Sequence, residues 1–256
     1  MPVYFISSAQ IDQKKIEIDR HLAHHLQNVL RVKVGETLLL VDEQPKRYQA
    51  KVIESSPGRL LLTIQGEESS IGNRSMVRLG IGMLKGEKMD WLLQKATELG
   101  VAVISPLITA RVVVKPKSDR LSHQNDRWIK IITEAAQQSG RWEIPQLDPP
   151  AVLETFLGGT NPGFKFIFYE GAPAGPLQKK MKEVIDTLPS LFQGTLLIGP
   201  EGGWEKSEVD QAIEKGYSVL SLGERTLRAE TAALAALSIM QYEIQGREGE
   251  KQDGNH

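Results

Sequence analysis

Two charged residues, Glu201 and Arg228, lie in loops where a side chain could do chemistry. Arg228 directly precedes an alanine-rich run that predicts a helix, and a cation near a helix start is mildly unfavourable. Arg228 therefore has no evident structural role, and a guanidinium can offset negative charge that develops during a reaction. Glu201 can accept a proton, or it can hold its loop by bonding backbone amides. The residues alone leave both roles of Glu201 open.

The loop that contains Glu201 follows a short apolar strand at 196–198 and reads Gly199-Pro200-Glu201-Gly202-Gly203. Its glycines let the backbone approach a ligand closely, whereas a plain strand-to-helix turn rarely needs three glycines, a proline and a carboxylate together. A second loop, 221–228, follows a strand expected at 217–220 and leads into the alanine-rich run. Two strand-loop-helix units of this kind predict a ligand crevice at one edge of an α/β sheet.

A third glycine-containing turn, Gly80-Ile81-Gly82 with Gly86, also lies between an expected strand and an expected helix. Its spacing is one residue too long for a dinucleotide-binding fingerprint, and no acidic residue follows at the place of a ribose ligand. We therefore expect a loop that presents Lys85 and Lys88, and not a dinucleotide site.

The composition is that of an ordinary globular protein, with 40% apolar and 25% charged residues among 256. The absence of cysteine excludes disulfides, thiolate metal sites and cysteine nucleophiles. No window approaches the roughly 20 apolar residues of a membrane span, and no leader pattern begins the chain, so we expect a cytoplasmic protein. The net charge is −1, yet residues 111–142 hold seven basic and three acidic residues, as a nucleic-acid surface or a solvated face would.

Alternating apolar runs and amphipathic patterns from Met76 onward predict a mostly parallel α/β sheet. Strands are expected at 77–83, 101–107, 164–169, 196–198 and 217–220, and helices at 89–99, 126–139, 149–156, 176–187 and 231–245. The polar segment 246–256 is expected to be disordered.

The first 72 residues predict a small β-barrel, with strands at 3–6, 37–41, 48–53 and 59–64. Asp19 is expected to cap a helix that runs to Leu30. The polar, glycine-containing segment 65–73 marks a domain boundary, so the expected domains are 1–72 and 73–245.

Long motifs in a fixed order resemble the RsmE family, the N3-uridine methyltransferases of small-subunit ribosomal RNA. The resemblance rests on the 199–203 loop and on Ser221-Leu222-Gly223 followed by Leu227-Arg228-Ala229-Glu230-Thr231-Ala232. Residues 95–101 with Pro106, and 134–141 with Pro145, are similar to the middle motifs of that family, and 24–35 to its N-terminal RNA-binding unit. The chain departs from the pattern at Ala229, where threonine is more frequent, and at 2–3, where a basic residue is expected.

The resemblance implies a PUA-like β-barrel followed by a SPOUT α/β domain with a deep trefoil knot, an exception to the rule of unknotted chains. It also implies a homodimer that associates through the final helix, and a site where three loops bind S-adenosyl-L-methionine (SAM) largely through backbone groups. The implied cofactor-binding residues are Tyr169, Glu170, Ile198, Gly199, Pro200, Glu201, Gly202, Gly203, Leu222, Gly223, Leu227, Arg228, Ala229 and Thr231.

An RNA-binding surface is implied as well, with basic and histidine side chains on both expected domains. The implied RNA-binding residues are Arg20, His24, His25, Arg31, Lys33, Lys85, Lys88, Arg111 and Arg141. Phosphate contacts by such residues make binding salt-dependent. His21, His24 and His25 share a helical face without an acidic ligand set, so solvated histidines are the alternative and no metal site is expected.

The function implied is SAM-dependent methylation of a 16S ribosomal RNA uridine at N3, with the small ribosomal subunit as partner. We expect Arg228 to offset charge on a uracil oxygen or to clamp a phosphate, and Glu201 to accept the proton unless it holds the loop. The missing cysteine independently excludes the cysteine addition that C5 methylation usually uses. Two alternatives are an RNA-binding assembly factor without turnover and a nucleotide-dependent enzyme that binds phosphate at the 199–203 loop.

Overall fold

The computed structural model describes residues 2–70, 76–112, 118–172, 181, 183–187 and 193–253. Its contacts divide the chain into two compact units, one formed by 1–72 with 134–144, the other by 73–133 with 145–256. Within the described residues, no helix is both long and apolar enough to cross a membrane.

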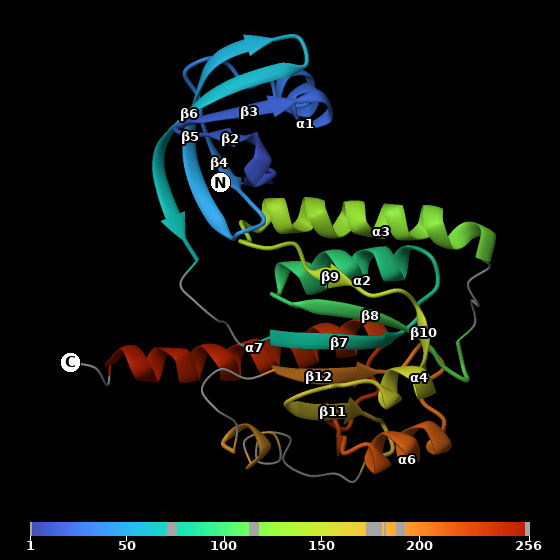
Figure 1. Ribbon diagram of the computed structural model, residues 1–256. Helices are drawn as coiled ribbons and strands as arrows, with labels where there is room; N and C mark the ends of the chain where they lie inside the picture. Colours follow the sequence, from blue (N-terminus) through green and yellow to red (C-terminus); the bar gives the residue numbers. More distant parts are fainter. Residues whose placement is uncertain are drawn as a thin grey trace. The chain divides into compact units, whose positions relative to one another are not determined.

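The first unit is built on a mixed six-stranded sheet whose strands alternate apolar and polar residues (Figure 1). Its strands are β1 (Val3–Phe5), β2 (Ile11–Asp12), β3 (Lys15–Asp19), β4 (Thr37–Val41), β5 (Lys46–Ser56) and β6 (Arg59–Ser69). They are hydrogen-bonded in the order β1-β4-β5-β6-β3-β2, and every pair is antiparallel except β1 with β4. Side chains alternate between the two faces of a strand, so every second residue of β3 and β6 can point into the core. The buried ones are Ile16, Ile18, Leu60 and Leu62.

The secondary structure after Asp12 differs from the predicted elements, both in a strand and in the length of the helix. Asp19 is the last residue of β3, where it pairs with Arg59, and it directly precedes α1 (Arg20–His24). The helix is also shorter than predicted, because α1 (Arg20–His24) gives way to a π-helix, η2 (His25–Val29). A 3-10 turn, η1 (Ser8–Gln10), precedes β2. The alternation of Ile16 and Ile18 with charged residues is the strand signal that decides this segment.

Residues 134–144 belong to the first unit, although the sequence analysis assigned them to the second domain. The Arg47 guanidinium of β5 lies 4.0 Å from the centre of the Trp142 ring, a cation–π contact. Its Nη2 also donates a hydrogen bond of 2.8 Å to the Gly140 carbonyl. These long-range contacts join the segment to β5, and no local pattern predicts them.

The second unit contains a parallel seven-stranded sheet, which confirms the α/β expectation. Its strands are β7 (Met76–Gly82), β8 (Val103–Ile108), β9 (Gln146–Leu147), β10 (Ala151–Val152), β11 (Phe164–Phe168), β12 (Gln193–Ile198) and β13 (Ser218–Leu220). The order is β10-β8-β7-β12-β11-β13, with β9 also paired to β8. Because β7 and β12 are central, both faces of each strand are covered, and the residues from Leu79 to Gly82 and from Gly194 to Ile198 are all buried.

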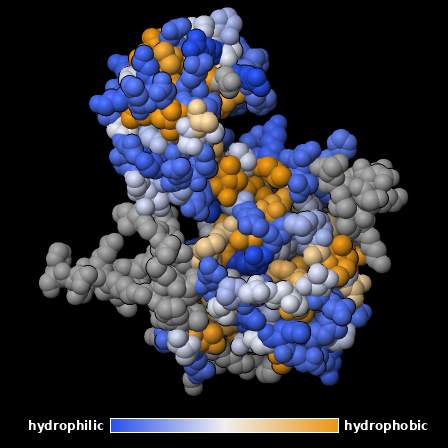
Figure 2. All heavy atoms as spheres, viewed as in Figure 1, coloured by the Kyte–Doolittle hydropathy of each residue, from blue (hydrophilic) through white to orange (hydrophobic). Residues whose placement is uncertain are grey.

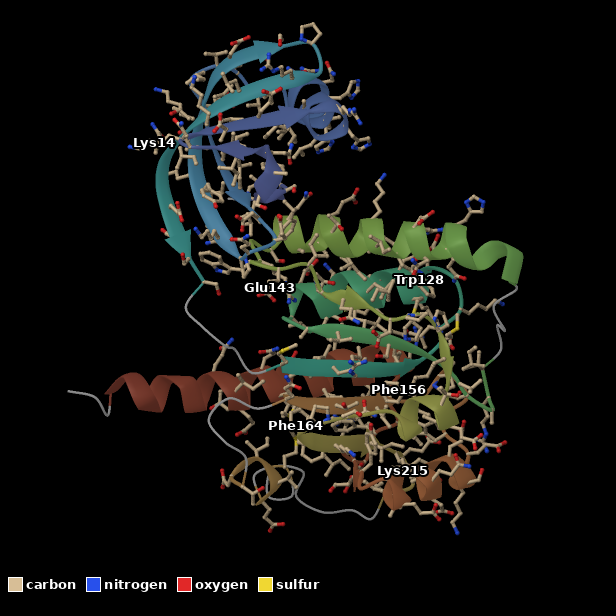
Figure 3. The ribbon with its side chains drawn as sticks, in the orientation of Figure 1. Lys14, Trp128, Glu143, Phe156, Phe164 and Lys215 are labelled. Atoms are coloured by element: carbon tan, nitrogen blue, oxygen red, sulfur yellow. The ribbon has the colours of Figure 1, made fainter. Side chains whose placement is uncertain are left out.

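Helices cover both faces of this sheet, so the unit has three layers. On one face pack α2 (Glu87–Glu98), α3 (Ser118–Gln138) and α7 (Ala229–Asp253), and on the other α4 (Leu153–Gly158) and α6 (Lys206–Glu214). Trp128 of α3 is buried and points from its helix toward α2 (Figure 3). Leu79 and Ile81 of β7 face the first helix layer, whereas Leu197 of β12 faces the second.

Two helices are longer than expected. α3 begins at Ser118, and α7 continues past Gly246 and Gly249 to Asp253, because Arg, Glu, Lys and Gln are good helix formers and offset the two glycines. Residues 254–256, the remainder of the tail that was expected to be disordered, lie outside the described residues. Half of the helix predicted at 176–187, residues 176–180 and 182, lies outside them too.

Candidate functional site

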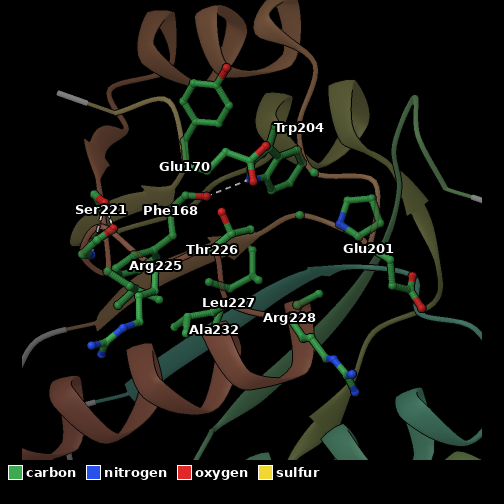
Figure 4. A pocket seen from close by; sticks show the side chains of 18 of the residues that line it. Phe168, Glu170, Glu201, Trp204, Ser221, Arg225, Thr226, Leu227, Arg228 and Ala232 are labelled. Atoms are coloured by element: carbon green, nitrogen blue, oxygen red, sulfur yellow. Dashed lines mark hydrogen bonds between the residues drawn. The ribbon is translucent and has the colours of Figure 1, made fainter. Parts of the chain in front are cut away.

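A cavity of about 250 Å³ opens at the carboxyl ends of β11, β12 and β13, beside the start of α7 (Figure 4). Its wall is formed by Lys88, Phe168, Tyr169, Glu170, Ile198, Gly199, Pro200, Glu201, Gly203, Trp204, Ser221, Leu222, Gly223, Glu224, Arg225, Thr226, Leu227, Arg228, Ala229 and Ala232. This is the edge at which parallel α/β sheets bind ligands, since the loops after adjacent strands converge there.

The 199–203 loop is fixed from beneath by close packing. A Cβ atom on Gly82, the last residue of β7, would lie 2.4 Å from the Pro200 nitrogen, so glycine is required at that position. Trp204 is buried, and its indole N–H donates a hydrogen bond of 3.0 Å to the Phe168 carbonyl at the end of β11. The dashed line of Figure 4 marks this bond, which ties two of the three loops together.

Arg111 holds the same loop from another side. Its Nη1 donates a hydrogen bond of 3.1 Å to the Gly202 carbonyl, and its Nε lies 3.9 Å from a Glu205 carboxylate oxygen. A Cβ atom on Gly202 would approach the Arg111 side chain to 2.9 Å. Arg111, expected to contact RNA, is thus engaged with the loop in this structure.

Glu201 is the best-partnered charged residue of the cavity wall. One carboxylate oxygen accepts hydrogen bonds from the Lys85 backbone N–H at 3.2 Å and from the Lys88 ammonium at 3.3 Å. Burial by itself raises the pKa of this carboxyl, but the backbone amides of Glu201 and Lys85 and the Lys88 ammonium outweigh it. The pKa therefore lies below its ordinary value, and the carboxylate is ionised at neutral pH.

Four other charged side chains of the wall remain available to a ligand. Glu170, Glu224, Arg225 and Arg228 form no hydrogen bond or ion pair among the side chains that the structure describes. In Figure 4 the two guanidinium groups point to opposite sides of the cavity. A ligand with an apolar part and both signs of charge, such as SAM, matches this wall of small residues, backbone groups and unpaired charges.

The structure brings together most of the implied cofactor-binding residues. Twelve of the fourteen line the cavity, whereas Gly202 lies under Arg111 and Thr231 is exposed on α7. The sequence analysis missed Phe168, Trp204, Ser221, Glu224, Arg225, Thr226 and Ala232 as wall residues. Most of these immediately adjoin the three expected loops, and that adjacency was the available signal.

The implied RNA-binding residues fall into two groups. Arg20, His24, His25, Arg31, Lys33 and Arg141 are in the first unit, and Lys85, Lys88 and Arg111 are in the second. Part of the basic segment 111–142, residues 113–117, lies outside the described residues. In the part that is described, no cluster of three or more His, Cys, Asp or Glu could hold a metal ion.

Apolar side chains accompany the basic ones on the first unit. Val29, Leu30 and Val34 are 62%, 45% and 57% exposed, and they flank the exposed residues Arg31 and Lys33. Figure 2 shows apolar groups between hydrophilic ones on the surface of this unit. Arg31 has a positive φ of 57°, unusual for a non-glycine residue, at the end of the π-helix turn.

Two family profiles match the chain. One, described as an RNA methyltransferase domain, matches residues 72–241, and the other, described as an RNA methyltransferase PUA domain, matches residues 18–65. Together they cover the sheet of the second unit and most of the sheet of the first.

Relatives of the same kind match over nearly the full length. Ribosomal RNA small subunit methyltransferase E of Bacillus subtilis is 30% identical over 98% of this chain and 100% of its own. The structure of the enzyme of that name from Neisseria gonorrhoeae, bound to SAM, has a TM-score of 0.80 at 29% identity and covers 94% of this chain and 97% of its own. A Legionella pneumophila methyltransferase structure with bound SAM has a TM-score of 0.82 at 30% identity, covering 95% and 98%. The resemblance drawn from the motifs is confirmed, and the chain belongs to the RsmE family of ribosomal RNA small subunit methyltransferases.

Proposed function

We propose that this chain methylates N3 of a specific uridine in the 16S RNA of the small ribosomal subunit, with SAM as cofactor. The observation that carries the proposal is the cavity at the carboxyl ends of β11, β12 and β13, in a chain of the RsmE family. SAM supplies a methyl group on a sulfonium, and the chain must align it with the ring nitrogen.

The cofactor-binding role is assigned to the fourteen residues named from the resemblance, of which twelve line the cavity. The glycines of the 199–203 and 221–228 loops expose backbone groups to a bound nucleoside. Glu170 adds a carboxylate that has no partner among the described side chains, and such a group suits ribose hydroxyls or an ammonium group.

Arg228 is proposed as the catalytic residue. Uridine N3 loses its proton before or as it is methylated, so negative charge develops on the adjacent ring oxygens. The Arg228 guanidinium lies at the cavity, pairs with no carboxylate in the described part of the chain, and can donate hydrogen bonds to such an oxygen. Pre-organised donors of this kind stabilise the charged state without reorganisation.

The first unit is proposed to bind the RNA around the target, through Arg20, His24, His25, Arg31, Lys33 and Arg141. Exposed apolar groups beside Arg31 and Lys33 support this, because unstacked RNA bases contact apolar and planar surfaces while cations bind the phosphates. The expected domains, 1–72 for RNA and 73–245 for the reaction, correspond to this division of roles.

A homodimer through α7 is proposed as well. This helix carries apolar side chains all round, with Leu237 and Met240 buried, Leu234 and Ile239 partly buried, and Tyr242 76% exposed. A helix with apolar side chains on every side is stable in water only when each side packs against other protein groups. Light scattering of the purified protein should report twice the chain mass, and the charged variant Tyr242→Glu should reduce it.

Two finer features of the fold, the closed barrel of the first sheet and the deep trefoil knot of the second unit, are also proposed. The knot can be tested by pulling a single molecule from its two ends. A knotted chain stops short of the roughly 3.5 Å per residue of an extended chain, whereas an unknotted one reaches it. A cytoplasmic location is proposed because the substrate is ribosomal.

The reaction is tested with methyl-labelled SAM and small ribosomal subunits from cells that lack this gene. The RNA is digested to nucleosides, which are then separated by mass spectrometry. Label in 3-methyluridine is the expected result, and label in another nucleoside would overturn the specificity. An absence of label and of SAM binding would favour an assembly factor, and tight ATP or NAD binding a nucleotide-dependent enzyme.

A further inference from the structure

One carboxylate joins the loop after β7 to the loop after β12. Glu201 accepts hydrogen bonds from the Lys85 backbone N–H and from the Lys88 ammonium, which lie 116 and 113 residues away in the chain. Lys88 is in the first turn of α2, and the positive end of a helix dipole favours an anion there. Glu201 is therefore held by contacts that all stabilise its ionised form.

These contacts make Glu201 a poor proton acceptor. A general base works best when its pKa is near the operating pH, and the pKa of this carboxyl lies below its ordinary range. The Glu201 side chain is 25% exposed, and one of its carboxylate oxygens already accepts two hydrogen bonds. Of the two roles that the sequence left open, the holding role is the better supported.

Lys88 is the partner that reaches the cavity. It lines the wall together with Glu201 and Arg228, whereas Lys85 does not line it. The Lys88 side chain is 43% exposed, and an ion pair so open to water contributes at most about 1 kcal/mol to stability. An ammonium has three N–H donors, so Lys88 can pair with Glu201 and still bond a second anion.

We propose that Glu201 is a positioning residue that holds the Lys88 ammonium at the cavity, where Lys88 binds an anionic oxygen of the nucleotide substrate. The inference rests on the proposed function and deepens it, because it assigns a specific substrate contact to Lys88. The oxygen belongs either to a phosphate next to the target uridine or to the uracil ring after N3 has lost its proton. Both sources present the same chemistry to a cation.

A double-mutant cycle on the full-length protein tests the coupling. Glu201→Gln and Lys88→Met should each lower kcat/KM on small subunits by at least about fivefold, and the double variant should be no worse than Lys88→Met alone. Lys85→Met keeps the backbone N–H, so its effect should multiply with that of Glu201→Gln. Multiplicative effects of Glu201→Gln and Lys88→Met would overturn the proposal, as would a Lys88→Met variant within about twofold of the wild type.

The pH dependence separates positioning from proton transfer. If Glu201 acts only by holding Lys88, Glu201→Gln and Lys88→Met have the same pH profile of kcat, because protonation of Glu201 then matters only through the ammonium. A Lys88→Met variant that keeps an acid limb which Glu201→Gln has lost would identify Glu201 as the base and overturn the proposal.

Two further measurements identify the oxygen and exclude trivial causes. A phosphate contact predicts that Lys88→Met raises KM and lowers the slope of log affinity against log salt by about one, whereas a uracil contact predicts a lower kcat at unchanged KM. Lys215→Met, at the end of α6 and outside the cavity wall (Figure 3), controls for lost charge and should match the wild type. If the wild type itself produces no methylated nucleoside, the proposed function fails, whatever the variants do.

Discussion

A single indole hydrogen bond connects two walls of the cavity. Trp204→Phe keeps the buried ring but removes the donor to the Phe168 carbonyl, which is left without that bond. We expect a loss of about 1–3 kcal/mol in the free energy of unfolding and weaker SAM binding. Urea denaturation and calorimetric titration measure the two effects.

Trp91→Phe is the matched control, since Trp91 is 45% exposed on α2 and the change should stay within about 0.5 kcal/mol. Equal stability of Trp204→Phe and Trp91→Phe would contradict the structural role of the indole N–H.

Arg228 carries the prediction about catalysis. Arg228→Ala should lower kcat/KM by about a hundredfold at saturating SAM, because a pre-organised donor to developing charge is worth about 3 kcal/mol. Arg228→Lys keeps the charge but not the planar fork, so it should recover only part of the loss. Steady-state rates with methyl-labelled SAM provide the measurement. A change of less than about threefold, or 0.6 kcal/mol, would remove Arg228 from the mechanism.

The residues that form the site could be predicted from the sequence better than the contacts that those residues make. The resemblance of the loop motifs to the RsmE family implied twelve of the twenty residues of the cavity wall in advance. The partners of Glu201 could not be identified, because Lys88 is 113 residues away and only the pairing of β7 with β12 brings the two loops together. The engagement of Arg111 with the Gly202 carbonyl was hidden for the same reason.

At the scale of elements, the end of β7 determines where the cavity loop lies. Gly82→Ala would place a Cβ atom 2.4 Å from the Pro200 nitrogen, and backbone atoms cannot turn aside as a side chain can. We expect a loss of about 1–3 kcal/mol in stability and at least about tenfold weaker SAM binding. Thermal unfolding and ligand titration test this.

Gly158→Ala at the end of α4 provides the comparison, since nothing lies within 4 Å of the added Cβ atom. If Gly82→Ala bound SAM as well as Gly158→Ala does, the close packing of β7 against the loop would not be needed for the site.

Helices and strands could be predicted from the local sequence pattern where that pattern extended over many residues. The alternation of strands and helices after Met76 was sufficient to predict a parallel sheet, and it was confirmed. The strand before Asp19 was not predicted, although Ile16 and Ile18 alternate with charged residues. Its pairing with β6 is a tertiary interaction, which a short local pattern does not reveal.

At the scale of the whole molecule, a buried phenol predicts how stability changes in alkali. Burial raises the pKa of Tyr217 from 10.0 to about 12. The folded state therefore keeps the proton longer than the unfolded state, and this contribution is complete below pH 10 and lost as the pH rises to about 12. The full shift corresponds to up to about 3 kcal/mol.

Urea midpoints measured between pH 9 and about 12 should fall with pH, and they should fall less steeply in Tyr217→Phe, which cannot ionise. Some slope will remain, because burial also raises the pKa of Tyr4 and of Tyr48. Identical slopes in the wild type and in Tyr217→Phe would contradict the assignment.

The division of the chain into 1–72 with 134–144, and the remainder, has a consequence for synthesis. A ribosome releases the chain from its first residue onward, so the segment that carries Trp142 emerges after β7, α2 and β8 have been made. At that moment β12, the central neighbour of β7, is still untranslated, since it begins at Gln193. The nascent chain must finish its first unit while β7, with only β8 available on one edge, lacks the partner for its other edge, which is more than a hundred residues away.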